Sequence, residues 1–572
     1  MTLLCVPIMI RSCDHAISEA AAAKAAGADI VEFRVDEFFD PSVVEADPER
    51  RERDMLRMVR ESPLPCIVTC RSSREGGGYA GTETERLDLY ERLGRMEGQP
   101  PRYLDFEHSM LVGEAGQRLS KMAGPAGSDR SPGLILSTHD FQGRPADLSR
   151  RVLAMRGEAL ASVVKIAYRA RSLRDNLELF ELLWEATEPT IALGMGEFGL
   201  MSRVLAPKFG GFLTFASLRP EAVTAPGQPT VGDLLEMFRF RAIRRTTKVF
   251  GVIGWPVGHS MSPLVHNAVF DEVGFDGVYL PLPIPGGEQP GSDGEEASYA
   301  SFKATVGALI DDPALDFGGA SVTLPHKENL VRFARERFKS EPGVWSLDAV
   351  SLATGAGNSL LIERSQAGRI ERARVFNTDV PAAVEPLRAA LGSLAGRAIA
   401  VLGAGGVARG IAFGLASAGA RVTIFNRSTE KAQRLAEALS AHLKGGGAIS
   451  VGALETLENA GEFAGFVQCT PVGMAGGPGP EGCPLPVVAI ERSRSNSGNN
   501  PEKPVVLDTV YNPVRTPLVR AALEQGWRVI DGVVMFVEQA ARQSEAWTGT
   551  TAPREMMERL VRARLGPPKN EA

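Results

Sequence analysis

Residues 228–262 read QPTVGDLLEMFRFRAIRRTTKVFGVIGWPVGHSMS, and this stretch divides the chain into two parts. Its left end completes a set of polar residues that are spread over the first part of the chain. Its right end opens a second polar segment, Gly258–Pro263. Between the two we expect a helical run over Leu234–Ile243. The basic residues Arg241, Arg244, Arg245 and Lys248 are interpreted as the solvated face of a linker, in preference to a nucleic-acid contact.

The bulk composition is that of an ordinary globular protein with several domains. The chain has 572 residues, 44% apolar and 23% charged, with a formal net charge of −6. That length is too great for one core, and the negative charge argues against a general nucleic-acid binder. The start reads as a first strand and not as a signal peptide, and no apolar run has the length of a membrane span. The six cysteines include no CxxC pair, so we expect a reducing cytoplasm.

Eight short apolar runs recur in the first 245 residues, and most are separated by segments of helical character. The helical segments are Ser18–Ala26, Glu83–Arg95, Leu148–Glu158 and Asn176–Glu185. The apolar runs are Leu3–Met9, Ile30–Val35, Pro65–Cys70, Tyr103–Phe106, Leu134–Ser137, Val163–Ala167, Thr190–Leu193 and Phe212–Phe215. Eight strands that alternate with helices predict a parallel (β/α)8 barrel, a TIM barrel, whose active site would lie at the far ends of the strands.

The polar residues at those strand ends favour chemistry on a ketone that carries a carboxylate. Lys165 follows Val163 and Val164, and an inward-facing lysine among apolar neighbours is penalised in its charged form. A neutral amine attacks ketones to form a Schiff base, although a strand-end lysine can also simply reach water. His139 ends the preceding strand and would serve as a proton shuttle.

Three arginines, Arg34, Arg71 and Arg203, add a cationic ring suited to a carboxylate substrate. They could instead pair with acids of their own chain, and Glu32 beside Arg34 keeps that alternative open. Asp105 and Glu107 also stand at a strand end.

Six ordered motifs in residues 1–240 resemble those of type I 3-dehydroquinate dehydratases. They are Val31–Asp36, Thr69–Arg71 with Glu75–Gly77, Ser137–Phe141, Val164–Ala167, Gly199–Arg203 and Ala225–Gln228. The resemblance implies that Lys165 forms an imine with the substrate ketone and that His139, oriented by Glu75, moves the protons. It also implies that the carboxylate and hydroxyls are held by Glu32, Arg34, Arg71, Arg203, Thr224 and Gln228, with Thr224 where the family often has serine.

Residues 246–572 begin with a strand, Val249–Ile253, and a helix that starts near Pro263. A second strand, Gly319–Leu324, leads into Lys327. Two stretches, Pro285–Ser298 and Glu491–Lys503, are polar and Gly- or Asn-rich, and we expect both to be inserted loops.

A strand over Arg397–Leu402 and a helix of small residues flank Gly403-Ala404-Gly405-Gly406-Val407-Ala408, a G-x-G-x-x-A motif in strand–turn–helix context. Such a turn lets backbone amides approach a pyrophosphate. The next strand, Arg421–Phe425, ends in Asn426-Arg427-Ser428, with no acid for the ribose hydroxyls of NAD. Arginine suits a 2′-phosphate, so the sequence predicts NADP.

A second set of motifs resembles shikimate dehydrogenases. It comprises Gly258–Pro263, Ser321–Lys327, Gly355–Ser359, Phe376–Asp379, the Gly-rich turn and Gly532–Gln539. The resemblance implies Lys327 and Asp379 as the catalytic pair. It implies substrate contacts from Ser260, Ser262, Thr323, Asn358, Tyr511 and Gln539. It implies cofactor contacts from Gly403, Ala404, Gly405, Gly406, Asn426, Arg427, Ser428, Thr470, Gly532 and Met535. The chain departs from the usual pattern at Ser321 and Ser359, where asparagine and threonine are common.

Taken together, the two resemblances imply a bifunctional enzyme. A barrel over 1–245 would dehydrate 3-dehydroquinate, and a substrate lobe over 248–385, completed by a helix at 531–552, would reduce the product to shikimate with a Rossmann domain over 386–530. Taken alone, Ser260 and Ser262 could be helix caps and Lys327 a surface charge. Two alternatives for the whole chain are NAD-dependent oxidation of quinate and a sensor without catalysis.

We expect small-molecule partners, no membrane and no nucleic acid. We also expect no metal, because His259 and His266 lack a third ligand. The oligomeric state is left open.

Overall fold

The computed structural model describes residues 1–38, 48–96, 100–111, 114–120, 131–222, 224, 227–286, 292–457, 463–486, 490 and 503–566. Within them the chain forms two compact units. One comprises Met1–Thr247 with Leu280–Ile284, and the other comprises Lys248–Tyr279 with Pro285–Ala572. No helix in the described part of the chain is long and apolar enough to cross a lipid bilayer.

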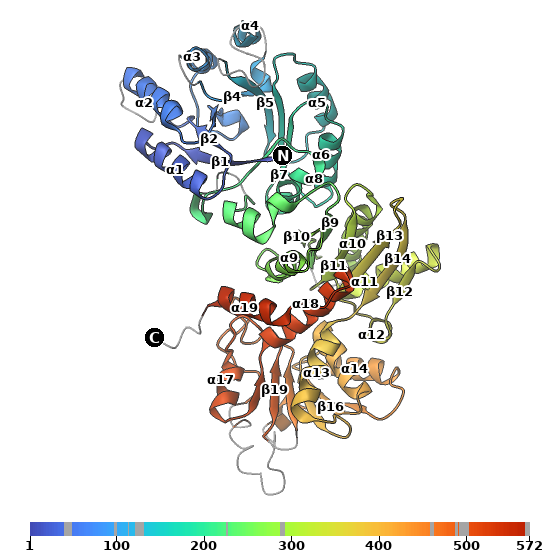
Figure 1. Ribbon diagram of the computed structural model, residues 1–572. Coiled ribbons are helices and arrows are strands. Elements are labelled where there is room, and N and C mark those ends of the chain that lie inside the picture. Colours follow the sequence, from blue (N-terminus) through green and yellow to red (C-terminus); the bar gives the residue numbers. More distant parts are fainter. Residues whose placement is uncertain are drawn as a thin grey trace. The chain divides into compact units, whose positions relative to one another are not determined.

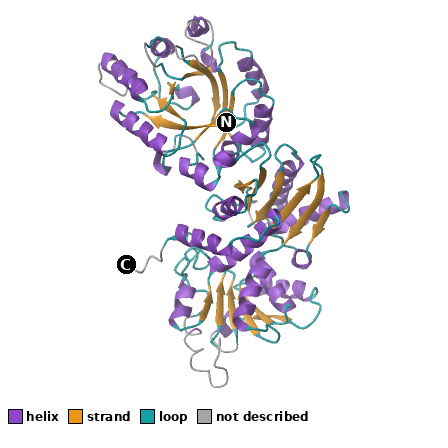
Figure 2. Ribbon diagram, in the orientation of Figure 1, coloured by secondary structure: helices purple, strands orange, loops and turns teal. Residues whose placement is uncertain are grey.

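The first unit contains the predicted eight-stranded parallel barrel, with helices outside the strands (Figures 1 and 2). The hydrogen-bonded order of the strands is β7-β6-β5-β4-β3-β2-β1-β8. Between β7 and β8, at the two ends of this order, the amide of Phe212 donates to the carbonyl of Thr190. The strands are β1 Leu3–Met9, β2 Ile30–Arg34, β3 Cys66–Thr69, β4 Tyr103–Glu107, β5 Gly133–Asp140, β6 Val163–Arg169, β7 Thr190–Met195 and β8 Leu213–Phe215. The helices are α1 Cys13–Ala25, α2 Pro48–Glu61, α3 Glu83–Gly94, α4 Glu114–Ser120, α5 Leu148–Arg156, α6 Asp175–Trp184, α7 Leu200–Val204 and α8 Ala206–Phe209.

The helix predicted over Leu234–Ile243 is wrong as a single element. The structure has a π-helix over Asp233–Met237, a left-handed Arg239 with φ 53°, and a 3-10 turn over Phe240–Ala242. Phe238 and Phe240 are both buried. Residues two apart project to nearly opposite sides of a regular helix, so the chain must break to bury both rings.

Two of the four basic residues in this stretch are exposed and also contact the barrel itself. Arg241 Nη1 lies 2.9 Å from Asp29 Oδ2, and the Arg245 guanidinium lies 4.4 Å from the centre of the Trp184 ring. These two side chains therefore lie on a solvated face, as expected, and in addition fasten the end of the first unit.

The second unit begins with a mixed sheet in the order β10-β9-β11-β13-β14-β12. Its strands are β9 Lys248–Gly254, β10 Gly277–Pro283, β11 Phe317–Val322, β12 Trp345–Leu347, β13 Ser359–Arg364 and β14 Ile370–Phe376. Its helices are α9 Ser262–Glu272, α10 Ser292–Asp311, α11 Lys327–Ser340 and α12 Ala349–Thr354. The loop predicted over Pro285–Ser298 is partly wrong, because α10 already begins at Ser292; residues 287–291 lie outside the described residues.

The third sheet is entirely parallel, in the order β17-β16-β15-β18-β19-β20. This is the doubly wound order of dinucleotide-binding folds. Its strands are β15 Ala398–Leu402, β16 Arg421–Phe425, β17 Ala448–Gly452, β18 Gly465–Gln468, β19 Val505–Asp508 and β20 Arg528–Ile530. Its helices are α13 Asp379–Leu391, α14 Gly406–Ser417, α15 Thr429–Ser440 and α17 Pro517–Glu524. Of the loop predicted over Glu491–Lys503, residues 491–502 lie outside the described residues.

The C-terminal helices return to the mixed sheet. Helix α18, Gly532–Thr548, buries Val533, Val537 and Ala540 in one cluster with Val265 of α9 and Met557 of α19, Arg554–Leu565. The Met535 side chain of α18 lies instead in the core of the parallel sheet.

Lys208 fixes the end of the barrel unit and gives a test of its packing. Its ammonium is buried and donates to the carbonyls of Arg245 and Thr247, each at 2.8 Å. Lys208→Met leaves both carbonyls without this donor, so we expect a loss of about 2 kcal/mol in the free energy of unfolding. Urea unfolding followed by circular dichroism measures it. The exposed Lys24, changed to Met, is the control and should shift stability by less than about 0.5 kcal/mol; equal shifts in both variants would contradict this account.

Candidate active sites

The carboxyl ends of the barrel strands bring all nine predicted barrel residues to one cavity. These side chains come from strands β2, β5 and β6, from the turn after β3, from helix α7 and from the segment before the seam. They are Glu32, Arg34, Arg71, Glu75, His139, Lys165, Arg203, Thr224 and Gln228. Phe141, Met195 and Phe215 supply apolar wall, so the cavity offers both charged and apolar contacts.

Lys165 lies deep in this cavity between two carboxylates. Its Nζ is 2.8 Å from Asp105 Oδ2 and 3.4 Å from Glu32 Oε1, and it lies 4.5 Å from the centre of the Phe215 ring. The expectation of purely apolar neighbours is therefore wrong, because two acids balance the ammonium. Burial raises the pKa of Asp105, but the charges of Arg71 and Lys165 outweigh burial and hold that pKa well below its usual range.

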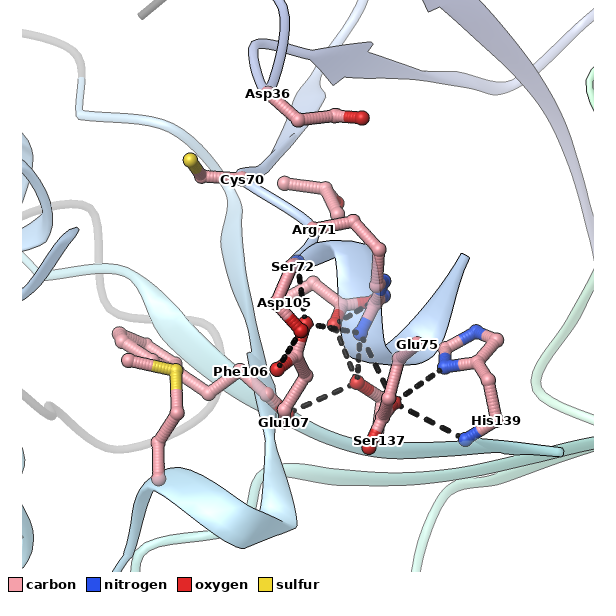
Figure 3. Close-up of polar contacts among 12 residues, drawn as sticks. Asp36, Cys70, Arg71, Ser72, Glu75, Asp105, Phe106, Glu107, Ser137 and His139 are labelled. Atoms are coloured by element: carbon pink, nitrogen blue, oxygen red, sulfur yellow. Dashed lines mark hydrogen bonds and ion pairs between the residues drawn. The ribbon is translucent and has the colours of Figure 1, made fainter. Parts of the chain in front are cut away.

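His139 is held by Glu75 through two contacts to the same carboxylate oxygen (Figure 3). Its backbone N–H donates to Glu75 Oε2 at 3.1 Å, and its Nδ1 lies 3.0 Å from that atom. Burial and the charges of Arg71 and Lys165 hold the pKa of His139 well below its usual value. Burial raises the pKa of Glu75 to about 7; Arg71 opposes this rise, and Glu107 and Asp105 add to it. A neutral ring whose Nδ1 is held in this way leaves Nε2 for proton transfer.

The three predicted arginines differ in their partners. Arg34 makes a two-point ion pair with Asp36, at 2.9 Å for each bond, so its acid partner is Asp36 and not Glu32. Arg71 binds Asp105 at 2.8 Å and the Ser137 hydroxyl at 2.8 Å.

Arg203 is different, because no carboxylate in the described part of the chain pairs with it. It is buried, its Nε has no hydrogen-bond partner, and burial lowers its pKa to about 10. A buried cation without an acid is suited to a substrate carboxylate. The Gln228 Nε2 is also buried without a partner, while its Oε1 accepts from the Thr224 hydroxyl at 3.1 Å.

In the second unit, Lys327 Nζ donates to Asp379 Oδ2 at 2.6 Å. Lys327 is the first residue of α11 and Asp379 the first residue of α13, so two helix starts place the pair. Lys327 also lines a cleft that includes Gly355, Gly406 and Arg409. A Cβ built on Gly406 would lie 3.9 Å from Lys327 Cδ, so the lysine and the Gly-rich turn face each other across this cleft.

The six predicted substrate residues of the second unit do not line that cleft, and several are engaged within the protein. The Ser260 hydroxyl accepts from the Ser262 amide at 3.2 Å, and Gln539 Nε2 donates to the Phe536 carbonyl at 3.1 Å. Tyr511 packs its ring on Phe536 at 4.9 Å between centres. Burial raises the pKa of Tyr511.

Asn358 is buried and lies beside the residue that precedes Asp379. Its Oδ1 accepts from the Thr378 amide and the Ser359 hydroxyl, both at 2.8 Å, and its Nδ2 donates to the Thr378 hydroxyl at 3.0 Å. Thr323 is only partly buried, and its backbone amide donates to the carbonyl of Ile253 at 2.8 Å.

The Gly-rich turn has the strand–turn–helix setting that the sequence predicts. Gly403 has φ +115°, Gly405 precedes the first turn of α14, and a Cβ on Gly405 would meet no atom within 4 Å. Ala404 is nearly buried between them. The open space beside a helix N-terminus fits a pyrophosphate.

Arg427 after β16 is exposed, and no ion pair joins it to another described residue. Its neighbour Asn426 donates from Nδ2 to the Ser428 carbonyl at 2.9 Å, and the Ser428 hydroxyl caps α15. The Thr470 hydroxyl donates to Gln468 at 3.0 Å. Gly532 and Met535 have evident packing roles, since a Cβ on Gly532 would overlap the Val510 carbonyl and Met535 is buried.

Four residues that touch these sites were not among the predicted site residues: Asp36, Asp105, Glu107 and Arg409. Asp105 and Glu107 were visible as acids at a strand end, but their partners are fixed by barrel closure and not by the local sequence. Among the described residues no cluster of three or more acids, histidines or cysteines is arranged to hold a metal ion. His266 is buried with its Nδ1 2.8 Å from the Ser544 hydroxyl.

Sequence profiles of known families match nearly the whole of the first unit and three stretches of the second. Residues 4–245 match type I 3-dehydroquinase. Residues 252–340 match the shikimate dehydrogenase substrate binding domain, 385–455 match shikimate / quinate 5-dehydrogenase, and 532–562 match the shikimate 5′-dehydrogenase C-terminal domain. The chain thus combines a barrel lyase with a two-lobed dehydrogenase.

Individual relatives agree with this division. The bifunctional 3-dehydroquinate dehydratase/shikimate dehydrogenase, chloroplastic, of Arabidopsis thaliana is 35% identical over 97% of this chain and 83% of its own length. The shikimate dehydrogenase (NADP(+)) of Methanocella arvoryzae is 35% identical over 55% of this chain and 99% of its own. The solved dehydroquinate dehydratase and shikimate dehydrogenase from S. pombe AroM is 24% identical, covers 98% of both chains and has a TM-score of 0.41.

The chain belongs to the family of bifunctional 3-dehydroquinate dehydratase/shikimate dehydrogenases. The two resemblances seen in the sequence are therefore confirmed, as are the barrel and Rossmann fold classes. It is an enzyme with two activities that belong to the shikimate pathway.

The ionisation of Glu75 gives a pH test of the barrel site. Its pKa of about 7 means that the carboxylate, which accepts from His139, predominates only above neutral pH. We expect the dehydratase kcat/KM to rise with pH through about 7 and then level off. Glu75→Gln should remove this acidic limb and lower the plateau on the order of tenfold to a thousandfold. A wild-type profile that is flat between pH 5.5 and 8.5 would contradict the assignment.

Proposed function

We propose that the barrel dehydrates 3-dehydroquinate to 3-dehydroshikimate through an imine on Lys165. The observation that carries this proposal is the shared cavity of Lys165, the His139–Glu75 pair and the unpaired Arg203. Lysine without its proton attacks the substrate ketone, and the carbonyl oxygen leaves as water. Asp105, 2.8 Å from Nζ, is placed to hold the ammonium until the substrate arrives.

The imine acidifies the neighbouring C–H, and His139 removes that proton through Nε2. The resulting enamine expels the hydroxyl on the next carbon, which His139 protonates so that it leaves as water. Hydrolysis then frees the product and restores the amine. Arg203 is proposed to bind the substrate carboxylate, and Arg34, Arg71, Glu32, Thr224 and Gln228 to orient the ring and its hydroxyls.

We propose that the second unit reduces 3-dehydroshikimate to shikimate with NADPH. When bound, NADPH supplies a hydride to the ketone carbon, and the open Gly403–Gly406 turn and the unpaired Arg427 fit its pyrophosphate and 2′-phosphate. Lys327 donates the proton to the ketone oxygen, and Asp379 holds the ammonium in place at 2.6 Å.

The proposed substrate contacts of this unit are Ser260, Ser262, Thr323, Asn358, Tyr511 and Gln539. Several of these residues are turned to partners within the protein, and their fit to substrate remains part of the proposal. We also propose domain limits of 1–245, 248–385 with 531–552, and 386–530, which the three separate sheets support.

Two other functions are less well supported. Oxidation of quinate with NAD would be favoured by an acid after β16, where this chain has Asn426 and Arg427. A sensor without catalysis would not need the Lys165–Asp105 and Lys327–Asp379 pairs, whose geometry serves proton chemistry.

Two lysine variants separate the proposed chemistries. Lys165→Met should abolish water loss from 3-dehydroquinate, seen as enone absorbance, and leave NADPH oxidation by 3-dehydroshikimate intact. Lys327→Met should do the reverse, with a loss on the order of a hundredfold or more in its own reaction. Borohydride with substrate should also give a stable adduct on Lys165, mapped by mass spectrometry. Full turnover of either variant at its own site would contradict the mechanism.

Arg427→Ala tests the cofactor proposal. Removing a charged hydrogen-bond donor to the 2′-phosphate should lower kcat/KM for NADPH by at least about tenfold and leave that for NADH nearly unchanged. The control is Arg434→Ala, an exposed arginine on α15 whose contact is to Glu430 of the same helix. If both variants retain wild-type selectivity between the cofactors, Arg427 has no part in cofactor binding.

A further inference from the structure

Glu107 is a buried carboxylate beneath the barrel site that does not line the cavity. It ends β4, two residues after Asp105, and its two oxygens accept both donors of Ser72. The Ser72 amide donates to Oε1 at 2.7 Å and the Ser72 hydroxyl to Oε2 at 2.8 Å (Figure 3). Two hydrogen bonds from one residue to both oxygens of a carboxylate fix the position and the orientation of that residue, here Ser72.

Ser72 is the base of the turn that carries Glu75. The amides of Glu75 and Gly77 donate to the Ser72 carbonyl at 3.1 and 2.8 Å, and the turn itself is a single 3-10 helix, Ser73–Glu75. A continuous series of hydrogen bonds therefore leads from β4 to His139. Glu107 binds Ser72, Ser72 binds the turn, and Glu75 of that turn binds His139.

We propose that Glu107 is a positioning residue of the dehydratase site: it anchors the turn that carries Glu75 and places a negative charge beside it. This inference rests on the proposed role of the His139–Glu75 pair. Glu107 does not line the cavity, and of the residues that do it meets Arg71, at 3.8 Å. Its effect on Glu75 and His139 therefore passes through Ser72 and through its charge.

The charges that face Glu75 come from three strands. Arg71 follows β3, with Nη1 3.7 Å from Glu75; Asp105 and Glu107 come from β4; and His139 comes from β5. Glu107 has cations of its own, Arg86 at 3.3 Å and Arg71 at 3.8 Å. The repulsion from Glu107 adds to burial in raising the pKa of Glu75. Removal of this one charge must therefore move that pKa down.

Two substitutions separate the anchor from the charge. Glu107→Gln keeps an acceptor for the Ser72 amide and removes the charge; its amide N–H faces the Ser72 hydroxyl, which then accepts instead of donating. In the pH profile of its dehydratase kcat/KM, the plateau should stay within about threefold of wild type, while the acidic limb should move to lower pH by on the order of one unit. Glu107→Ala removes the anchor, and its plateau should fall on the order of ten- to a hundredfold.

Glu83→Gln is the matched control. Glu83 also lies near Arg86, at 3.8 Å from its Nε, but it is half-exposed on α3 and does not contact the turn. Both its plateau and its acidic limb should match wild type. The dehydrogenase rate of each preparation, measured with shikimate and NADP, reports the amount of intact chain.

An acidic limb of Glu107→Gln at the wild-type pH overturns the proposal, and so does an unchanged plateau in Glu107→Ala. If Glu107→Ala does not fold, Ser72→Ala replaces it; this variant keeps the charge and loses one anchoring bond. Its plateau should then fall about fivefold with the limb unmoved, and a wild-type plateau overturns the anchor. A wild-type protein without dehydratase activity would instead contradict the proposed function itself.

Discussion

Charge balance at the carboxyl ends of the barrel strands is the constraint on which the first site depends. Arg71 is buried among Asp105, Glu75 and Glu107, while Asp105 also meets Lys165. Buried charges are costly unless each has a partner in good geometry. The buried charges of Arg71, Asp105 and Lys165 therefore balance one another. Arg203 alone of the three predicted arginines has no acid among the described residues, and this asymmetry supports the proposal that it binds a substrate carboxylate.

The two lysine sites use similar ion pairs on different supports. Lys165 stands inside a parallel strand, where hydrogen bonds on both sides fix the backbone, and its ammonium meets acids from β2 and β4. Lys327 and Asp379 instead stand at the starts of two helices, next to a cleft shared with the Gly-rich turn. The proposed covalent nucleophile is thus held within the barrel, and the proposed proton donor is held at the edge of a cleft.

The sequence predicted the barrel strands well, because each is a buried apolar run with polar residues at its end. Leu3–Met9 agrees at both ends, and the other seven runs differ by a few residues. It also predicted that the proposed barrel site residues meet at the carboxyl ends of the strands, where they line one cavity, since that position follows from strand order. It failed where tertiary packing overrides local pattern: Phe238 and Phe240 break the helix expected at the seam, and the polar run before Ser298 continues as α10.

Ion-pair partners could not be predicted from the sequence either, because they too depend on tertiary packing. Glu32 and Asp36 each lie two residues from Arg34, so the local sequence does not distinguish them as partners. In the structure Asp36, beyond the strand end, is the acid that pairs with Arg34, whereas Glu32 lies 3.4 Å from Lys165 of another strand. Asn358 likewise has its side-chain oxygen occupied by its neighbour Ser359 and by Thr378, which lies 20 residues further along the chain. Such pairings depend on how strands close into sheets.

Helix α18 has a consequence for the order in which the protein is made. All eight barrel strands lie within the first 215 residues, so the ribosome releases that unit's sheet early. The mixed sheet begins at Lys248, but the helix that packs with α9 spans Gly532–Thr548, and the same helix sends Met535 into the parallel sheet's core. Neither lobe of the dehydrogenase is complete until the last segment of the chain has emerged. Domains near the N-terminus generally fold first during synthesis, so the nascent chain passes through a long interval with a finished barrel and two lobes that still lack a shared helix.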